Sequence, residues 1–244
     1  MTQLVLAAGA FLAIHFLVAG TALRGVLVGA LGERVYLALF SLASIGLFVW
    51  LVLAYGAARA AGSPLLWSAP LWAYHLVPVL MLPVILLAVA GLTTPSPTLV
   101  GGEGRLARDA AAPDHGVRGV ITITRHPFLS AVALWALIHG LVNGDVAALI
   151  LFATFLLLGL GGPVSIDAKR ARSAGPAWEG FARTSSAVPF AAIAAGRTRL
   201  DLAGIGWGRL GLGLAVYGLL LLGGHACLVG ASPMPGVLAA ACPL

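Results

Sequence analysis

Long apolar runs, separated by short polar stretches, set the pattern of this chain. An α-helix needs about 20 apolar residues to cross a hydrocarbon core of about 30 Å. The runs are too long and too continuous for strands of a membrane barrel, the alternative to helices in lipid. We therefore predict an all-α, polytopic membrane bundle that forms a single domain over residues 1–244. About six transmembrane helices are expected, at residues 4–23, 35–57, 71–92, 127–142, 146–164 and 210–230, the fourth being short.

The segments between these runs comprise tight turns, one long loop and one amphipathic stretch. Asn143-Gly144-Asp145 is a tight turn that should join the fourth and fifth helices as a hairpin. Residues 93–124 form a loop rich in Gly and Pro, and loops of this length are often functional or flexible. Residues 165–207 are polar and partly amphipathic, so we expect them at the membrane interface.

Composition and charge support the membrane assignment and orient the chain. Hydrophobic residues make up 60% of the sequence and charged residues 9%, against about 25% charged in soluble domains. The net charge is +6, and the basic residues lie between the apolar runs. This placement indicates a membrane topology with the lipid bilayer as partner, and not a nucleic acid. With the N-terminus outside, all 14 Lys and Arg residues except Arg59 would lie inside. Six spans then leave both termini outside.

Six histidines are the notable polar feature of the apolar runs and their borders. Ionisable groups inside membrane spans are costly and usually functional. A single histidine near the interface, however, more often donates a hydrogen bond to a carbonyl than binds a metal. The six are His15, His75, His115, His126, His139 and His225.

The stretch Arg125-His126-Pro127 opens the fourth predicted helix. Proline suits the first helical position, and exposed helix N–H groups beside two cationic side chains favour an anion there. His126 and His139 are thirteen positions apart, which is about 20 Å along a helix, and they point to different sides. The two histidines therefore cannot bind one metal ion, and the segment contains either two separate sites or one site and one membrane anchor.

Four blocks of the sequence resemble the NnrU family of bacterial membrane proteins, which is related to the plant 15-cis-zeta-carotene isomerases. The more specific blocks are GVITITRHPFLSAVALWALIHGLVNGD from Gly119 and DAKRARSAGPAWEGFARTSSAVPFAAI from Asp167. The weaker ones are HFLVAGTALRGVL from His15 and YLALFSLASI from Tyr36. Together the blocks span most of the chain from residue 15 to about residue 200.

This resemblance implies a multi-pass protein of the bacterial inner membrane associated with nitrogen-oxide metabolism, in which nitrite and nitric oxide reductases take part. The related isomerases are haem b proteins, and the family pattern implies His15 and His139 as the axial ligands here. Neutral imidazoles suit haem iron. The expected chemistry is redox or isomerase-type, on a lipid-soluble substrate such as a polyene or quinone.

Helix geometry favours a rival set of ligands. His15 lies about eleven residues into its predicted helix, roughly 16 Å deep, whereas His139 lies about three residues from the outer end, roughly 5 Å deep. His75, His139 and His225 each lie within about six residues of the outer face and could form a three-histidine metal site. Both sets remain open, with His15 and His139 as the set that the family resemblance implies.

The same blocks more distantly resemble the isoprenylcysteine carboxyl methyltransferase-like proteins. The family's helix start RHPxYxG falls on Arg125-His126-Pro127, but its tyrosine falls on Leu129 and its glycine on Ala131. Loss of hydroxyl groups removes hydrogen bonds that S-adenosylmethionine would use. A methyltransferase-like enzyme and a non-enzymatic accessory or assembly protein for a reductase are the alternatives, so the sequence does not decide whether this is an enzyme. The remaining counterparts of the methyltransferase pattern are Asp167, Gly175, Trp178 and Phe181.

Overall fold

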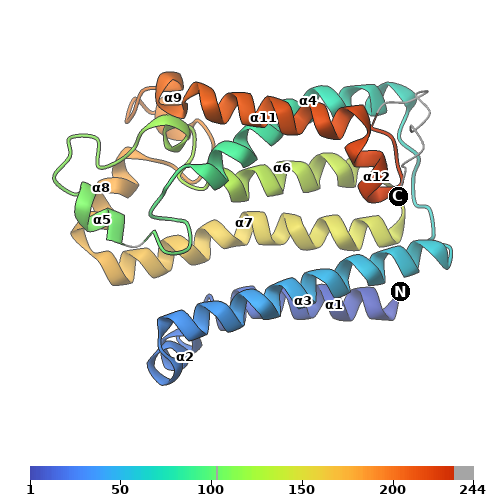
Figure 1. Cartoon of the computed structure of the whole chain (residues 1–244), viewed down its shortest axis with the longest axis horizontal. Coiled ribbons are helices and arrows are strands. Elements are labelled where there is room, and N and C mark those ends of the chain that lie inside the picture. Colours follow the sequence, from blue (N-terminus) through green and yellow to red (C-terminus); the bar gives the residue numbers. More distant parts are fainter. Residues whose placement is uncertain (103, 234–244) are drawn as a thin grey trace.

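Every regular element of the described residues is a helix, as the apolar pattern predicts (Figure 1). The computed structural model describes residues 1–102 and 104–233. The long helices are α1 (Thr2–Ala13), α3 (Glu33–Ala60), α4 (Leu71–Thr93), α6 (Pro127–Val142), α7 (Val146–Ala174) and α11 (Trp207–Leu219). The short ones are α2 (Leu23–Leu31), α5 (Gly104–Asp109), α8 (Pro176–Thr184), α9 (Ala191–Ala194), α10 (Leu202–Ile205) and α12 (His225–Val229). Single turns of other helix types occupy Ile14–Val18 and Leu220–Gly224, which are π-helical, and Gly119–Thr122, which is 3₁₀.

Four helical segments of the described chain are long and apolar enough to cross a membrane. They are α3, α4, α7 and the continuous segment Trp207–Val229. A fifth is reached if Thr2–Val18 and Leu23–Leu31, which bend by 78° at their junction, count as one span. Helix α6 is apolar but has 16 residues, about 24 Å of helix. The structure therefore supports four to five spanning helices, fewer than the six expected from the sequence.

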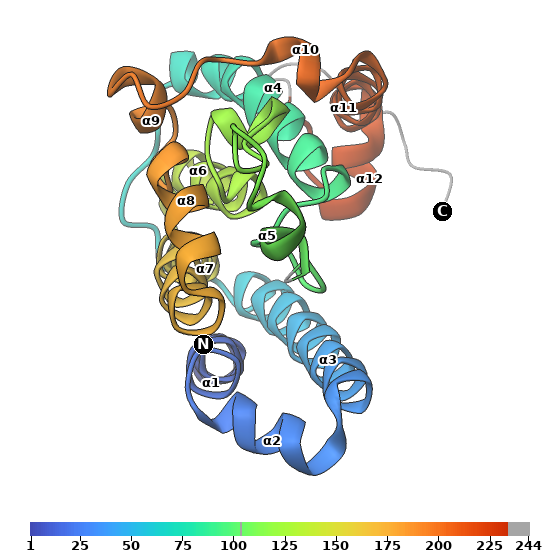
Figure 2. The ribbon, with the colours of Figure 1, turned by 90° about the vertical axis from the view of Figure 1, so that its left-hand side faces the viewer.

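The helices pack in a continuous order across the molecule. Helix α11 packs on α4, α4 on α6, and α6 on α7, while α1 joins this bundle to α3. Figure 2, viewed along the helices, shows α1 and α3 as an N-terminal hairpin beside α7, with the short α2 connecting the two helices. The predicted hairpin of the fourth and fifth helices is confirmed: α6 ends at Val142, α7 begins at Val146, and the Asp145 carboxylate caps α7 by accepting the Ala148 N–H at 3.0 Å.

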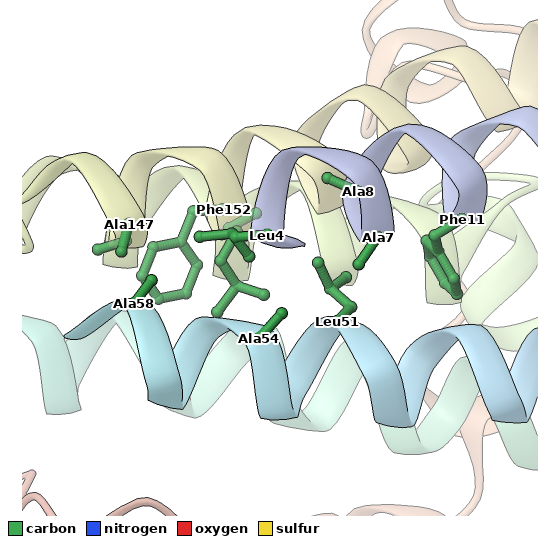
Figure 3. Packing of buried hydrophobic residues seen from close by; sticks show 12 residues of the cluster. Leu4, Ala7, Ala8, Phe11, Leu51, Ala54, Ala58, Ala147 and Phe152 are labelled. Atoms are coloured by element: carbon green, nitrogen blue, oxygen red, sulfur yellow. The ribbon is translucent and has the colours of Figure 1, made fainter. Parts of the chain in front are cut away.

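Small side chains bring the N-terminal hairpin close to the bundle. Figure 3 shows Leu4 and Ala7 of α1 facing Leu51 and Ala54 of α3. Ala147 and Phe152 of α7 belong to the same buried cluster. Helix pairs in lipid commonly pack through small residues, because alanine and glycine let backbones approach closely.

The outward face of α3 supports the membrane assignment. Exposed apolar side chains recur along it at the three-to-four-residue spacing of one helix face, and such a long apolar stripe in water would be a liability. In a bilayer the same stripe faces lipid. The side chains are Val35, Leu39, Leu42, Ile45, Val49 and Leu53.

Charged residues separate toward the two ends of the bundle. Arg59, the one basic residue expected outside, lies 3.9 Å from the Asp145 carboxylate, at the end where α3 leads to α4. Helices α2, α5, α8 and α9 gather at the opposite end (Figure 1). Helix α7 continues beyond its apolar part into the polar sequence 165–174, so part of the stretch expected at the interface extends the long helix instead.

Candidate functional site

The start of α6 is held to α7 by a group of three side chains. His126, whose side chain is 1% exposed, donates its Nε2–H to Asp167 Oδ1 at 2.7 Å. Arg125 donates to the other carboxylate oxygen of Asp167, through Nε at 2.9 Å and through a terminal guanidinium nitrogen. The Arg125 guanidinium also lies 5.6 Å from the centre of the Trp178 ring. The anion expected at this helix start is thus a carboxylate of the chain itself.

Other counterparts of the methyltransferase pattern serve packing. Trp178 and Phe181 are buried in α8, with ring centres 5.6 Å apart, in a cluster that also holds Ile121 and Ile205. Gly175 has a φ of 50°, and this positive φ lets the chain turn from α7 into α8. Neither aromatic ring is among the residues that line the described cavities.

His15 lies in the π-helical turn at Ile14–Val18. Its Nδ1–H donates to the Phe11 carbonyl at 2.7 Å, and its ring lies 4.6 Å from the Phe11 ring and 5.5 Å from the Phe40 ring. The side chain lines a cavity of about 360 Å³, which His126 lines as well. His15 therefore belongs to the end of the molecule where α6 begins.

His139 lies at the other end of α6 and faces His225. The two ring centres are 6.4 Å apart and the rings are inclined by 24°. His139 also contacts the rings of Trp135 and Phe152, at 5.2 and 5.4 Å. Both histidines line a cavity of about 260 Å³ between α4, α6 and α11, together with Tyr74.

The structure therefore does not bring His15 and His139 together. The rings of Phe11, Phe155 and Trp135 follow one another between them, with centres 5.8 and 5.5 Å apart. Of the rival set, His139 and His225 meet, whereas His75 is exposed on α4 and is not among the residues lining their cavity. Among the described residues, no group of three or more His, Cys, Asp or Glu side chains is arranged to hold a metal.

Three of these histidines share one hydrogen-bonding pattern. His15, His139 and His225 each donate Nδ1–H to a backbone carbonyl, at 2.7, 2.9 and 2.7 Å. That bond fixes the neutral tautomer in which Nε2 keeps its lone pair, the arrangement in which histidines bind metals. Two imidazole nitrogens on opposite sides of one ion are about 4 Å apart, so their ring centres are about 6 Å apart.

The ring-centre separation of His139 and His225 is consequently that expected for two histidine ligands of one metal ion or haem iron. The enclosed volume is less favourable: 260 Å³ lies below the range of about 300–1,000 Å³ usual for small-molecule sites. Imidazole donors suit haem iron, whereas a porphyrin ring is larger than this cavity and would extend beyond it.

Irregular helix turns accompany both ligand candidates, a feature that sequence reasoning missed. His15 lies within one π-helical turn, and His225 directly follows the other, Leu220–Gly224, in which Gly223 has a φ of 146°. Such turns are rare in proteins overall, and those that occur are frequently found at functional sites. Gly223-Gly224 before His225 was the available signal, because two glycines inside an apolar run mark an irregular helix.

A third cavity, of about 410 Å³, has an almost entirely apolar lining. It lies between α4 and α6, closed at one end by α10 and the residues before α9. Leu134 and Ile138 of α6 line it, while Trp135 and His139, one residue further on, line the histidine cavity. One helix thus borders an apolar site and a histidine site on adjacent faces.

These features define a polytopic helical membrane protein with histidine-lined cavities at both ends of its short central helix. The family described as "NnrU protein" matches residues 3–233. The chain belongs to the NnrU family. Comparison with curated proteins and with solved structures gives no match.

Proposed function

We propose that this NnrU-family protein binds a transition metal, as haem b, with His139 as one ligand, and acts in nitrogen-oxide metabolism. The observation that carries the proposal is the His139–His225 pair, with ring centres 6.4 Å apart and each Nδ1–H donated to a carbonyl. Haem iron with two imidazole ligands supplies one-electron chemistry when it is bound. The second ligand is His225 by geometry, or His15 by family resemblance.

The surrounding residues would hold the imidazoles and exclude water. Trp135 and Phe152 pack against the His139 ring, which limits its rotation. Tyr74 and Asn143 donate hydrogen bonds to carbonyls at the end of α6, so the helix that carries His139 keeps its last turn. A ligand held in this way is oriented before any metal arrives.

The apolar cavity beside α6 is our candidate for the substrate site. Its volume of about 410 Å³ and apolar lining suit part of a lipid-soluble molecule such as a polyene or quinone. We propose redox or isomerase-type chemistry on such a molecule, because this cavity has apolar walls and the His139 imidazole lines the neighbouring cavity on the adjacent face of α6. Polar substrates would lose their hydration in this cavity without gaining hydrogen bonds.

For the membrane topology we propose six spans in a bacterial inner membrane, with both termini outside. The basic residues gathered inside support this orientation. The bent segment of α1 and α2 would supply the first span and the short α6 the fourth. The C-terminal residues 234–244 lie outside the described part of the chain.

The test is the absorbance and metal content of protein purified in detergent from haem-replete cells. We expect a Soret band that His139→Ala abolishes. Loss of the band in His225→Ala but not in His15→Ala would assign the second ligand by geometry, and the converse would assign it by family resemblance. His75→Ala is the matched control, because His75 is exposed on α4.

A colourless, metal-free preparation would refute the proposal. If that preparation retained a nitrite or nitric oxide reductase subunit, the accessory role would replace the metal-binding proposal. Heat released on titration with S-adenosylmethionine would instead favour the methyltransferase-like alternative, to which the Trp178 and Phe181 positions belong.

A further inference from the structure

The cavity that His15 and His126 line lies where the hairpin of α1–α3 meets α7, at the end of the bundle that carries α2. It consists of two contiguous hollows, of about 360 and 100 Å³, which share Ala19, Phe40 and Lys169 in their walls. We call the two hollows together the Arg24 cavity, because Arg24 lines the smaller one. Figure 2 looks along the bundle from this end, with α2 and α3 below α7 and α5.

The two hollows differ in chemistry. Phe16, Leu129 and Leu158 make the larger one mainly apolar. The smaller one is lined by Arg24, Lys169 and Arg170, and the described residues of both linings include no carboxylate. An elongated space that is apolar along most of its length and cationic at one end matches an anionic amphiphile.

The Arg24 side chain is positioned by its neighbours and keeps donors available. Its guanidinium lies 5.5 Å from the centre of the Tyr36 ring, and one terminal nitrogen donates to Glu33 at 3.1 Å. A guanidinium has five N–H donors, so this exposed ion pair occupies only part of its capacity. Cation–π contact with Tyr36 holds the guanidinium near the ring, and a guanidinium can bind a phosphate in a bidentate way.

Tyr36 supplies an independent observation. The residue is 4% exposed and lines the smaller hollow, yet its hydroxyl is buried with no hydrogen-bond partner among the described residues. Buried polar groups are nearly always hydrogen-bonded, and an unpartnered hydroxyl needs an explanation. An anionic oxygen bound beside Arg24 would be an acceptor close to this hydroxyl.

We propose that the Arg24 cavity binds a phosphate ester that carries an apolar chain, an anionic phospholipid in its simplest form. The phosphate would lie against Arg24 and Tyr36, and the chain would occupy the larger hollow beside His15 and Phe16. This site is independent of a metal centre formed by His139 and His225, because neither residue lines it, whereas His15, the second ligand by family resemblance, lines its larger hollow. A free phosphate would fill the smaller hollow and leave the apolar one without contact.

The experiment measures lipid retention by native mass spectrometry on delipidated protein. Phosphatidylglycerol, phosphatidylcholine and inorganic phosphate are added separately at equal concentration. We expect retention of phosphatidylglycerol alone. Arg24→Gln should weaken it about tenfold, because it removes a charge-assisted contact, and Arg34→Gln, an exposed arginine on α3, should leave it unchanged.

A second variant tests the shape of the site without changing charge. Ala19 lies in the wall of both hollows, so Ala19→Phe should block the junction and abolish phosphatidylglycerol retention. The thermal midpoint of each variant reports whether the fold survives. Equal retention of phosphatidylcholine, equal retention of inorganic phosphate, or unchanged retention in folded Arg24→Gln and Ala19→Phe would each overturn the proposal.

Discussion

Asp167 connects the start of α6 to α7, and its loss should destabilise the bundle strongly. Asp167→Asn leaves Arg125 and His126 without the carboxylate that they share. Breaking a buried ion pair by removing one partner costs about 3–5 kcal/mol. The Arg125 and Asp167 side chains are 14% and 20% exposed, so we take the lower end, about 3 kcal/mol. For a domain of this size that is a fall of about 6–12 °C in the thermal midpoint.

The assay is thermal unfolding in detergent, followed by tryptophan fluorescence. The matched control is Asp114→Asn, because Asp114 forms an ion pair with Arg118 whose side chains are 38% and 63% exposed. Exposed pairs contribute about 0–1 kcal/mol, so the control should shift the midpoint by less than about 4 °C. Equally small shifts of the thermal midpoint in both variants would refute the conclusion that Asp167 stabilises the contact between α6 and α7. In the double variant with Arg125→Gln, the two losses should not add, since both remove the same contact.

Two further predictions concern close backbone approach and pH. A Cβ at Gly91 would lie 2.6 Å from the Phe128 backbone nitrogen. Gly91→Ala should therefore push α4 away from α6 and lower the free energy of unfolding by about 1–3 kcal/mol. The control is Gly46→Ala, in open space on α3, which should leave stability unchanged or raise it. Equal midpoints for the two would contradict this. Asp201 accepts the Gly119 and Gly204 N–H groups, both at 2.8 Å, and these bonds hold the pKa of its carboxyl below the usual range. The stabilisation by the Asp201 carboxylate is therefore complete at neutral pH and lost as pH falls below about 4. Asp201→Asn should accordingly reduce the loss of stability at acidic pH. Parallel stability–pH curves for the wild-type protein and the variant would contradict the reasoning.

The placement of the long helices could be predicted from apolar runs, but their ends, and which of them are long enough to span a membrane, could not. Hydropathy reports where a helix leaves the membrane, and α7 continues through Asp167 to Ala174 because its polar residues still favour helix. The break between Val18 and Leu23 has no breaker stronger than Gly20. There both the local backbone and a contact with α7 require glycine, since a Cβ on Gly20 would lie 2.5 Å from the Phe16 carbonyl oxygen and 2.8 Å from the Ser165 hydroxyl.

Within the candidate sites, helix geometry predicted that His126 and His139 lie far apart, but it did not predict which residues they contact. His126 and His139 do line different cavities, as their thirteen-residue spacing requires. The residues they meet, Asp167 and His225, come from α7 and α12, and no spacing along α6 could select them. His225 was within reach as a member of the rival set, whereas its π-helical approach depends on how Gly223 turns in the folded chain.

The short length of α6 follows from how its ends are satisfied. A helix leaves its last carbonyls without partners, and in lipid each unpaired group is costly. Here those carbonyls accept side-chain donors: His139 O from Asn143 at 2.8 Å, Leu141 O from Trp67 at 3.0 Å and Val142 O from Tyr74 at 3.1 Å. The far end of this 16-residue helix therefore does not depend on reaching water, and Asp167 anchors the two side chains that precede its start. His139 thus lies on a helix held at both ends, and a ligand site needs that rigidity to keep an imidazole in place before its metal binds.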